Sequence, residues 1–388
     1  MSKIAILGAS GFVGTAVVRQ ARAAGHEVHA FARSTGSSWE LSRQGIEVRR
    51  LNLGDRDATQ AALQGFDAVI NCMRGGNMVG TLDNTLHAVK ANGIARFVHL
   101  SSISIYGDYP DPASASETAA PAPTNEYGAM KLEQDELVMA AAARGDVRAV
   151  ILCPPNITGP GSGFITDIVK AVASRQFVRA DGDWVCAMVD VDNLAHAALC
   201  AVASNVSGAR YFVTDNDSIT WARLVETLQP LAGNVPVRSV DPEVLRAAAG
   251  KPPGIPKPSF RKALKRLVAP EIRSTLAAEP FFYNLFAGAK AAVFKLPKPV
   301  LKRIASVASP PVSVPRLPLL GDANVRLSAQ QLRGVDHSCA AAMREIGYTP
   351  LYDTEQSLRR FSVWYTFMWP PSHGEGRPGA PVGTGSWL

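Results

Sequence analysis

The chain has 388 residues and a formal net charge of +7, from 40 lysines and arginines against 33 acidic residues. Its length favours more than one domain with a large core, and no apolar run reaches the roughly 18 residues of a membrane-spanning helix. Five cysteines without C-x-x-C spacing and seven scattered histidines indicate a reducing cytoplasm and argue against structural zinc, so we expect no metal. The N-terminus leads directly into a strand pattern, and no signal peptide is visible.

The first predicted strand is followed by a glycine-rich turn. Residues 3–7 are short and apolar, as in a buried parallel strand. Gly8, Gly11 and Gly14 follow at every third position, and a helical pattern covers 15–24. This order would bring backbone N–H groups and a helix N-terminus to a pyrophosphate, so the turn is predicted to bind a dinucleotide. The alternative is a tight turn without a ligand, since the spacing is not the commoner G-x-G-x-x-G.

The second predicted strand, 27–33, bears on the choice of cofactor. A dehydrogenase that prefers NAD usually ends this strand with an acidic residue on the ribose hydroxyls. Here Ala32 stands at that place and Arg33 follows. A guanidinium suits a 2′-phosphate, so the sequence predicts NADP(H) rather than NAD(H). The alternative is a solvated arginine at a strand end.

Farther along the chain, a serine cluster precedes a tyrosine and a lysine at helical spacing. Ser101 and Ser102 follow an apolar run, and Tyr127 lies four residues before Lys131. Residues four apart share one helix face, so an ammonium group would lie beside a phenol. A neighbouring cation favours the phenolate and lowers the pKa of the tyrosine, which could then shuttle a proton to or from a substrate oxygen. Alone, such a pair is also found on ordinary helix faces.

Together these features resemble the extended, epimerase/dehydratase-like branch of the short-chain dehydrogenase/reductase superfamily. The resemblance covers most of 1–230 and about 325–366, through the segments 8–14, 77–81, 99–107, 154–161, 189–197 and 346–350. It implies a Rossmann-type doubly wound parallel α/β sheet with a smaller C-terminal substrate lobe. It also implies that Ser102 hydrogen-bonds the substrate oxygen, that Tyr127 transfers its proton and that Lys131 holds the nicotinamide ribose. Cofactor contacts are expected from Gly8, Ser10, Gly11, Phe12, Val13, Gly14, Arg33, Asp55, Asn71, Tyr127, Lys131, Pro154 and Asn156.

The chain departs from the family pattern at two places that border the expected substrate site. Three residues, 74–76, separate the predicted strand at 68–73 from the helix segment beginning at Asn77, where the family has many more. Thr158 stands where the family usually has a tyrosine. The segment 207–215 with Trp221 is similar to the hydroxysteroid-dehydrogenase-like subgroup, which implies a lipophilic alcohol or ketone. A nucleotide sugar and a non-catalytic dinucleotide-binding role remain the alternatives.

Residues 251–303 differ in composition, with twelve lysines and arginines against two glutamates. Basic amphipathic segments with aromatic residues can lie at a membrane interface, so 255–303 could contact a lipid surface or cover a lipophilic substrate; a structural cap is the plain alternative. We expect no nucleic-acid partner, and a homodimer is possible. The predicted organisation is a dinucleotide-binding domain at 1–250, a helical insert and remaining substrate lobe at 251–369, and a disordered tail at 370–388.

Overall fold

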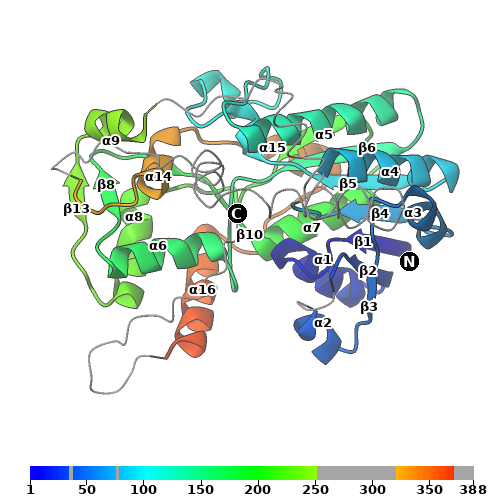
Figure 1. Ribbon diagram of the computed structural model, residues 1–388, viewed down its shortest axis with the longest axis horizontal. Coiled ribbons are helices and arrows are strands. Elements are labelled where there is room, and N and C mark those ends of the chain that lie inside the picture. Colours follow the sequence, from blue (N-terminus) through cyan, green and yellow to red (C-terminus); the bar gives the residue numbers. More distant parts are fainter. Residues whose placement is uncertain (35–37, 76–77, 251–319, 371–388) are drawn as a thin grey trace, which may run out of the picture. The chain divides into compact units, whose positions relative to one another are not determined.

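The computed structural model describes residues 1–34, 38–75, 78–250 and 320–370, which belong to one compact unit (Figure 1). The basic segment 255–303, Asn77 and nearly all of the predicted disordered tail lie outside the described residues. The domain boundaries expected from the sequence therefore stay predictions.

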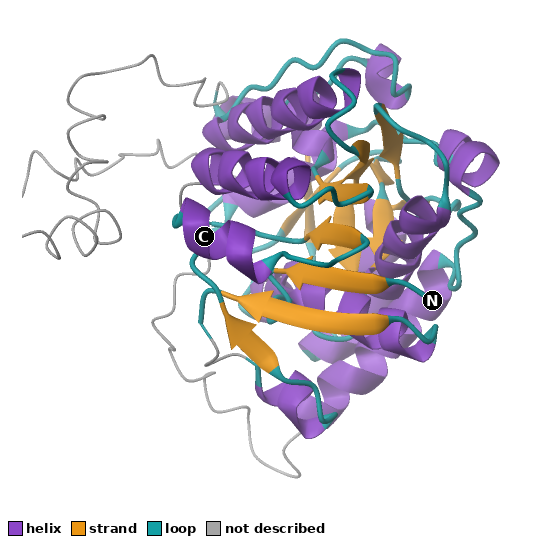
Figure 2. Cartoon of the chain, turned by 90° about the vertical axis from the view of Figure 1, so that its right-hand side faces the viewer, coloured by secondary structure: helices purple, strands orange, loops and turns teal. Residues whose placement is uncertain are grey.

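A seven-stranded parallel sheet lies at the centre of this unit (Figure 2). Its strand order is β11-β6-β5-β4-β1-β2-β3, and every neighbouring pair is parallel. The order reverses between β1 and β4, which makes a crevice at their carboxyl ends the expected ligand site. The predicted doubly wound fold is confirmed. The strands are β1 (Lys3–Leu7), β2 (Glu27–Ala32), β3 (Val48–Arg50), β4 (Ala68–Asn71), β5 (Arg96–Leu100), β6 (Arg148–Cys153) and β11 (Ala209–Phe212).

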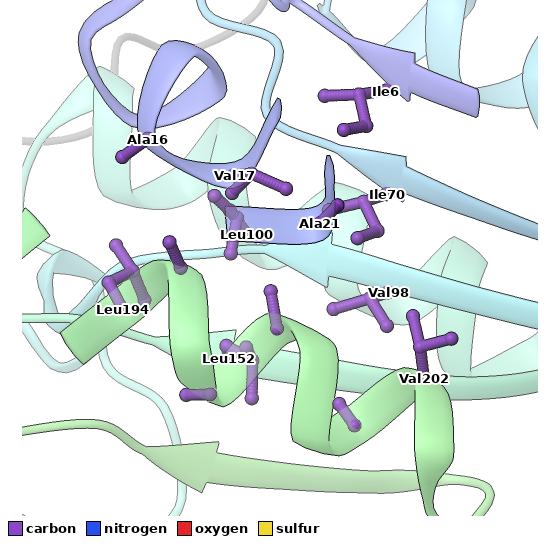
Figure 3. Packing of buried hydrophobic residues seen from close by; sticks show 14 of the residues in the cluster. Ile6, Ala16, Val17, Ala21, Ile70, Val98, Leu100, Leu152, Leu194 and Val202 are labelled. Carbon is purple, nitrogen blue, oxygen red and sulfur yellow. The ribbon is translucent and has the colours of Figure 1, made fainter. Parts of the chain in front are cut away.

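Helices cover both faces of the sheet because strand side chains alternate between the faces. Ile4 and Ile6 lie in one buried cluster with the apolar stripes of α1 and α7, part of which Figure 3 shows. Ala5 and Leu7 lie in the other cluster, with α4 and α5. On the first face are α1 (Phe12–Ala23), α2 (Trp39–Arg43), α7 (Val191–Ala203) and α15 (Ala340–Ile346); on the second are α3 (Arg56–Ala62), α4 (Met78–Ala91) and α5 (Glu126–Ala143).

The chain after β6 also builds a smaller lobe with its own core around Trp221 and Phe361, both buried. Three two-stranded sheets belong to it: β7 (Asn156–Thr158) with β10 (Met188–Asp190), β9 (Val185–Cys186) with β12 (Ile219–Thr220), and β8 (Val178–Ala180) with β13 (Arg238–Val240). Its α-helices are α6 (Gly163–Ala173), α8 (Trp221–Leu228), α9 (Pro242–Ala249), α14 (Val325–Ser328) and α16 (Thr354–Met368). The 3-10 helices of the unit are η1 (Ile103–Tyr106), η2 (Pro112–Ala115), η3 (Gln229–Ala232) and η4 (Ala329–Arg333).

Polar contacts hold the last described helix, α16, against Thr158 in β7 and against Asp190 and Asp192 at the start of α7. Ser357 Oγ donates to Asp190 Oδ2 at 2.6 Å and lies 2.6 Å from Thr158 Oγ1. Arg360 bridges Asp190 Oδ2 at 2.8 Å and also pairs with Asp192. Thr158, which replaces the tyrosine of the family pattern, is thus fully buried and hydrogen-bonded within the lobe.

Candidate active site

In the turn after β1, Gly8 and Gly14 stand where a side chain would clash with backbone. Gly8 has φ +77°, and its N–H donates to the carbonyl oxygen of Phe31 at 2.9 Å. A Cβ on Gly14 would lie 2.2 Å from the carbonyl oxygen of Gly8, so α1 could not pack this closely against the turn with any other residue. The close packing of α1 against the turn therefore requires these glycines, whereas a surface turn without such packing would not.

This turn leads into the N-terminus of α1, where no side chain caps the helix. The N-cap, Gly11, has no side chain to offer, and the first backbone N–H groups of a helix lack intrahelical partners. Phe12 and Val13, the first two helical residues, are half-buried. An uncapped helix N-terminus approached by a glycine backbone fits the pyrophosphate of a dinucleotide. The predicted cofactor turn is thus compatible with the group it is expected to bind.

On the adenosine side of the crevice, the two predicted contact residues are exposed. Arg33 lies just after the carboxyl end of β2. Asp55 is the N-cap of α3, and its Oδ1 accepts from the N–H of Ala58 at 2.9 Å. Asp55 therefore has a structural role that the sequence reading did not assign. Its predicted contact with the adenine amino group stays a prediction.

Ser102 and Tyr127 approach each other from two different elements. Ser102 follows β5 and caps η1, with its Oγ accepting from the N–H of Ser104 at 3.2 Å. Tyr127 lies in the first turn of α5, whose N-cap Asn125 accepts from the N–H of Gly128 at 2.8 Å. A hydrogen-bonding interaction between the Tyr127 phenol and Ser102 favours the phenolate. The fold thus brings together two of the three predicted catalytic residues.

The pKa of Tyr127 is raised above its usual value, because burial disfavours the phenolate more than its neighbours favour it. Among those neighbours, Arg74 has the largest lowering effect, followed by Ser102. The guanidinium carbon of Arg74 lies 6.0 Å from the centroid of the Tyr127 ring. The sequence reading expected Lys131 as the cation that acts on the phenol and did not single out Arg74. The short 74–76 connection was the signal that could have indicated it.

Lys131 lies one turn after Tyr127 on α5 and is 3% exposed. Its Nζ donates to the carbonyl oxygen of Leu100 at 2.7 Å. Burial lowers the pKa of Lys131 to about 8, and the Asp135 carboxylate is the strongest influence in the opposite direction. Asp135 is fully buried on the next turn and pairs through Oδ2 with Arg210 Nε at 3.1 Å. Sequence reasoning missed this supporting pair, although the four-residue spacing from Tyr127 continues to Asp135.

The remaining predicted cofactor residues also lie at the carboxyl edge of the sheet. Asn71 ends β4 and is buried, with its side-chain nitrogen 3.1 Å from His99 Nδ1 and its oxygen accepting from the N–H of Met73. The carbonyl oxygen of Pro154 accepts from the N–H of Ile103 at 3.2 Å. Asn156 begins β7, where its side chain donates to the carbonyl oxygen of Ala187 at 3.4 Å. The hydrogen bonds of Asn71 and Pro154 support the turns beside Ser102 and β4.

A small cavity of about 20 Å³, large enough for one water molecule, lies beside Asn156 at this edge and beside residues of the smaller lobe. Most of its lining is apolar, with polar groups from Asn156, Gln330, Arg333 and His337. Arg333 pairs with Asp108 at 3.3 Å, and Asp108 also accepts from the Asn125 side chain at the start of α5. The cavity and the start of α5 therefore share one polar support. The lining residues are Ile103, Gly107, Pro110, Asn156, Val185, Ala187, Trp221, Gln330, Arg333, Val335 and His337.

Two other features are absent from the described residues. No helix among them is long and apolar enough to cross a membrane. In the same part of the chain, no group of three or more His, Cys, Asp or Glu side chains could hold a metal ion.

Comparison with known proteins identifies the family. Residues 4–213 match the NAD dependent epimerase/dehydratase family, and the chain belongs to it. This family includes NAD(P)-dependent dehydrogenases, reductases and epimerases similar to this chain. The protein is accordingly an NAD(P)-dependent oxidoreductase of the extended short-chain dehydrogenase/reductase type, as the sequence resemblance predicted.

The similar proteins differ in what they act on. The 2-alkyl-3-oxoalkanoate reductase of Stenotrophomonas maltophilia is 30% identical over 256 residues, covering 60% of this chain and 76% of its own. The 3 beta-hydroxysteroid dehydrogenase/Delta 5-->4-isomerase of Mycobacterium tuberculosis is 24% identical, covering 97% and 94%. Among solved structures, a nucleoside-diphosphate-sugar epimerase from Pseudomonas aeruginosa matches with a TM-score of 0.64 at 18% identity, covering 95% of this chain and 98% of that one. The structural likeness supports the fold.

Proposed function

We propose that the protein is an NADP(H)-dependent reductase or dehydrogenase that transfers hydride to or from a carbonyl or hydroxyl carbon of a lipophilic small molecule. The observation that carries the proposal is the interaction of Ser102 with Tyr127, one helical turn from buried Lys131.

The bound nicotinamide supplies or accepts the hydride, and the protein's own residues handle the proton. Tyr127 is a phenol at neutral pH because its pKa is raised, so it can donate a proton to a carbonyl oxygen that is being reduced. Ser102 hydrogen-bonds the same substrate oxygen. Once the proton has left, Arg74 and Ser102 stabilise the phenolate, since both lower the pKa of Tyr127. The ionisation state of Tyr127 therefore suits the reducing direction.

Lys131 adds a positive charge beneath this pair and would hold the nicotinamide ribose. Its hydrogen bond to Leu100 fixes the ammonium group at the end of β5, the strand that also positions Ser102. Asp135 favours the protonated, charged form of Lys131, whereas burial alone disfavours that form. The Asp135 carboxylate therefore helps to keep Lys131 charged without contacting the substrate.

The preference for NADP(H) rests on Arg33. Its guanidinium is exposed at the end of β2, next to buried Ala32, where an acidic residue would repel a 2′-phosphate. Arg33 would pair with that phosphate through charge-assisted hydrogen bonds.

The preference for a lipophilic substrate rests on the named activities of two similar proteins, a 2-alkyl-3-oxoalkanoate reductase and a 3 beta-hydroxysteroid dehydrogenase. A nucleotide-sugar substrate is the second candidate, favoured by similar epimerases such as that of Streptomyces lividans. A role in binding dinucleotide without turnover would leave the Ser102–Tyr127 pair without a purpose.

The test is a comparison of two substrate panels. The purified full chain is incubated with NADPH and either cyclic and long-chain ketones or UDP- and dTDP-sugars, and loss of NADPH absorbance and product mass are followed. Ketone reduction that disappears in Tyr127→Phe supports the proposal. Conversion of a nucleotide sugar, with no ketone reduced, would overturn the substrate class. Tight NADPH binding without turnover on either panel would favour the non-catalytic role.

A further inference from the structure

Arg74 is a cation beside the catalytic tyrosine that has no counter-ion of its own. It belongs to the short connection between β4 and α4, and its guanidinium carbon lies 6.0 Å from the centroid of the Tyr127 ring. The side chain is exposed, and no carboxylate of a described residue forms an ion pair with it. Burial is the main cause that lowers the pKa of Lys131, and the charge of Arg74 lowers it further. Two neighbouring cations therefore lie near the phenol.

The backbone just before Arg74 is fixed by its neighbours. The N–H of Met73 donates to Asn71 Oδ1 at 3.2 Å. On the other side, a Cβ on Gly8 would lie 2.9 Å from the carbonyl carbon of Cys72, so the connection packs closely against the glycine turn. Arg74 follows directly after these contacts. Its backbone is therefore held at the carboxyl end of β4, and its long side chain can adjust to a ligand.

The carboxylate that acts most strongly on Lys131 cannot neutralise Arg74. Asp135 is fully buried one turn beyond Lys131, and it pairs through Oδ2 with Arg210 Nε at 3.1 Å. Arg74, in contrast, is exposed on the side of the phenol. The accessible part of the catalytic site therefore carries a positive charge that an anion would balance.

The position of Arg74 restricts which anion this can be. A guanidinium binds a carboxylate through two parallel hydrogen bonds. Because Arg74 lies beside Tyr127, the carboxylate has to be only a few bonds from the reacting carbonyl. The diphosphate of a nucleotide sugar is separated from carbon 4 by the width of the sugar ring, and the pyrophosphate of the cofactor is expected at the N-terminus of α1.

Resting on the proposed function, we propose that Arg74 is a specificity-determining residue that binds a carboxylate of the substrate, a few bonds from the carbon that exchanges hydride. The substrate is then an oxo acid with an apolar chain, or the corresponding hydroxy acid. Ser102 and Tyr127 hold the carbonyl oxygen, Arg74 holds the carboxylate, and the two contacts together orient the carbonyl carbon. Arg74 neither gives nor takes a proton.

The probes are 4-oxononanoate and freshly hydrolysed 3-oxononanoate, each compared with its methyl ester, which differs by one negative charge. Binding to the full chain is measured by calorimetry with NADP⁺ present, so that no turnover is required. Wild type should bind at least one of the acids about 10-fold or more tightly than its ester, as expected of hydrogen bonds between charged groups. Arg74→Gln should bind acid and ester within about 3-fold of each other. Arg74→Lys, which keeps the charge but not the paired donors, should keep part of the preference.

Kinetics give a second readout. Burial raises the pKa of Tyr127 and Arg74 partly opposes this, so substitution of Arg74 should slow the turnover of acid and ester alike. The ratio of kcat/KM for acid and ester therefore reports the carboxylate contact, and it should fall in Arg74→Gln. Arg144→Gln removes a surface arginine that pairs with Asp146, makes the same change in net charge and should leave the ratio unchanged. Because Arg74 is exposed, both of its variants should unfold in urea as wild type does.

Four results would overturn the inference: wild type that binds neither acid more tightly than its ester, a preference that survives in Arg74→Gln, the same loss of preference in Arg144→Gln, or a large loss of affinity for NADP⁺ alone in Arg74→Gln, which would assign the guanidinium to the cofactor. Failure of the proposed function looks different. Ketone reduction without an Arg74-dependent preference removes the carboxylate site alone. An Arg74-dependent preference in binding, without NADPH oxidation on any probe, removes the reductase proposal and leaves the carboxylate site.

Discussion

The carboxyl edge of the sheet and the pocket of the smaller lobe are built in different ways. At the sheet edge, short motifs act through backbone: Gly8 and Gly14 allow close approach, and the N-terminus of α1 offers its N–H groups. The pocket is lined by side chains from segments far apart in the chain, including Ile103, Trp221 and His337. A motif local in sequence can therefore identify the predicted cofactor turn, whereas the lining of the cavity depends on tertiary packing.

The largest expected effect comes from the proton donor at the sheet edge. Tyr127→Phe removes the transferable proton and keeps the ring, so turnover should fall by about 10²-fold or more while NADPH affinity changes little. Steady-state kinetics and calorimetric titration measure the two quantities. Tyr211→Phe is the control, because it removes a phenol that bonds Glu345 outside the site. Turnover within a few-fold of wild type would break the assignment of Tyr127.

The next effect separates the cofactor half from the substrate half. Arg33→Ala should weaken NADPH binding by about 10-fold or more and leave NADH binding nearly unchanged, since one cofactor alone carries the 2′-phosphate. The Michaelis constant for the ketone should stay the same. Arg43→Ala, which removes an exposed arginine in the last turn of α2, serves as the control. Equal losses for both cofactors, or a wild-type preference for NADH, contradicts the proposed role.

A smaller effect should appear in the pH profile. Asp135 raises the pKa of Lys131 against the effect of burial, and that pKa is about 8. Asp135→Asn removes this influence, so Lys131 should lose its proton at lower pH. The alkaline limb of kcat/KM, along which the positive charge is lost, should move to lower pH, and activity at pH 8 should fall several-fold.

Two controls accompany this variant. Asp146 pairs with Lys90 and Arg144 at the surface, so Asp146→Asn should leave the pH profile unchanged. Because Asp135→Asn also leaves Arg210 without its partner, urea unfolding must show that the variant is folded at the assay temperature. A folded variant with an unchanged alkaline limb would show that Asp135 acts on structure alone.

The smallest expected effect concerns whether the protein takes an apolar substrate from a lipid surface. If residues 255–303 contact lipid, the full chain should sediment with anionic vesicles at low salt and be released as salt rises, because exposed charges are screened within about 10 Å at 0.1 M. Vesicles of phosphatidylcholine alone are the control and should retain little protein. No retention on anionic vesicles at low salt would make this segment irrelevant to substrate supply.

Much of the fold and the cofactor side was predictable because periodicity and turn chemistry act locally. Gly8, Gly11 and Gly14, the strand at 27–33 and the Tyr127–Lys131 spacing all carry their meaning within a few residues. The Asp135–Arg210 pair was not predictable in the same way, since Arg210 enters from the edge strand β11.

Arg74 and His337 show two further reasons why some residues could not be singled out from the sequence. Arg74 reaches the Tyr127 ring because the connection after β4 is short, a feature visible in the sequence whose geometric result is not. His337 becomes notable through the burial of its ring beside Phe212, a property that exists in the folded chain alone. Sequence patterns identify groups that act through their neighbours in the chain, and they miss groups defined by their neighbours in space.

The contacts of α16 have a consequence for how the protein is synthesised. Asp190 and Asp192 receive Arg360 from a helix near the end of the chain, and Thr158 receives Ser357 from the same helix. At about 5–20 residues per second, roughly 7 to 30 s pass between the synthesis of β11 and that of α16. During this interval Asp190 lacks the Arg360 guanidinium, whereas Asp192 can already pair with Arg19 of α1, and the apolar residues that α16 covers are exposed. Until α16 is synthesised, the nascent chain therefore exposes apolar surface that chaperones would bind.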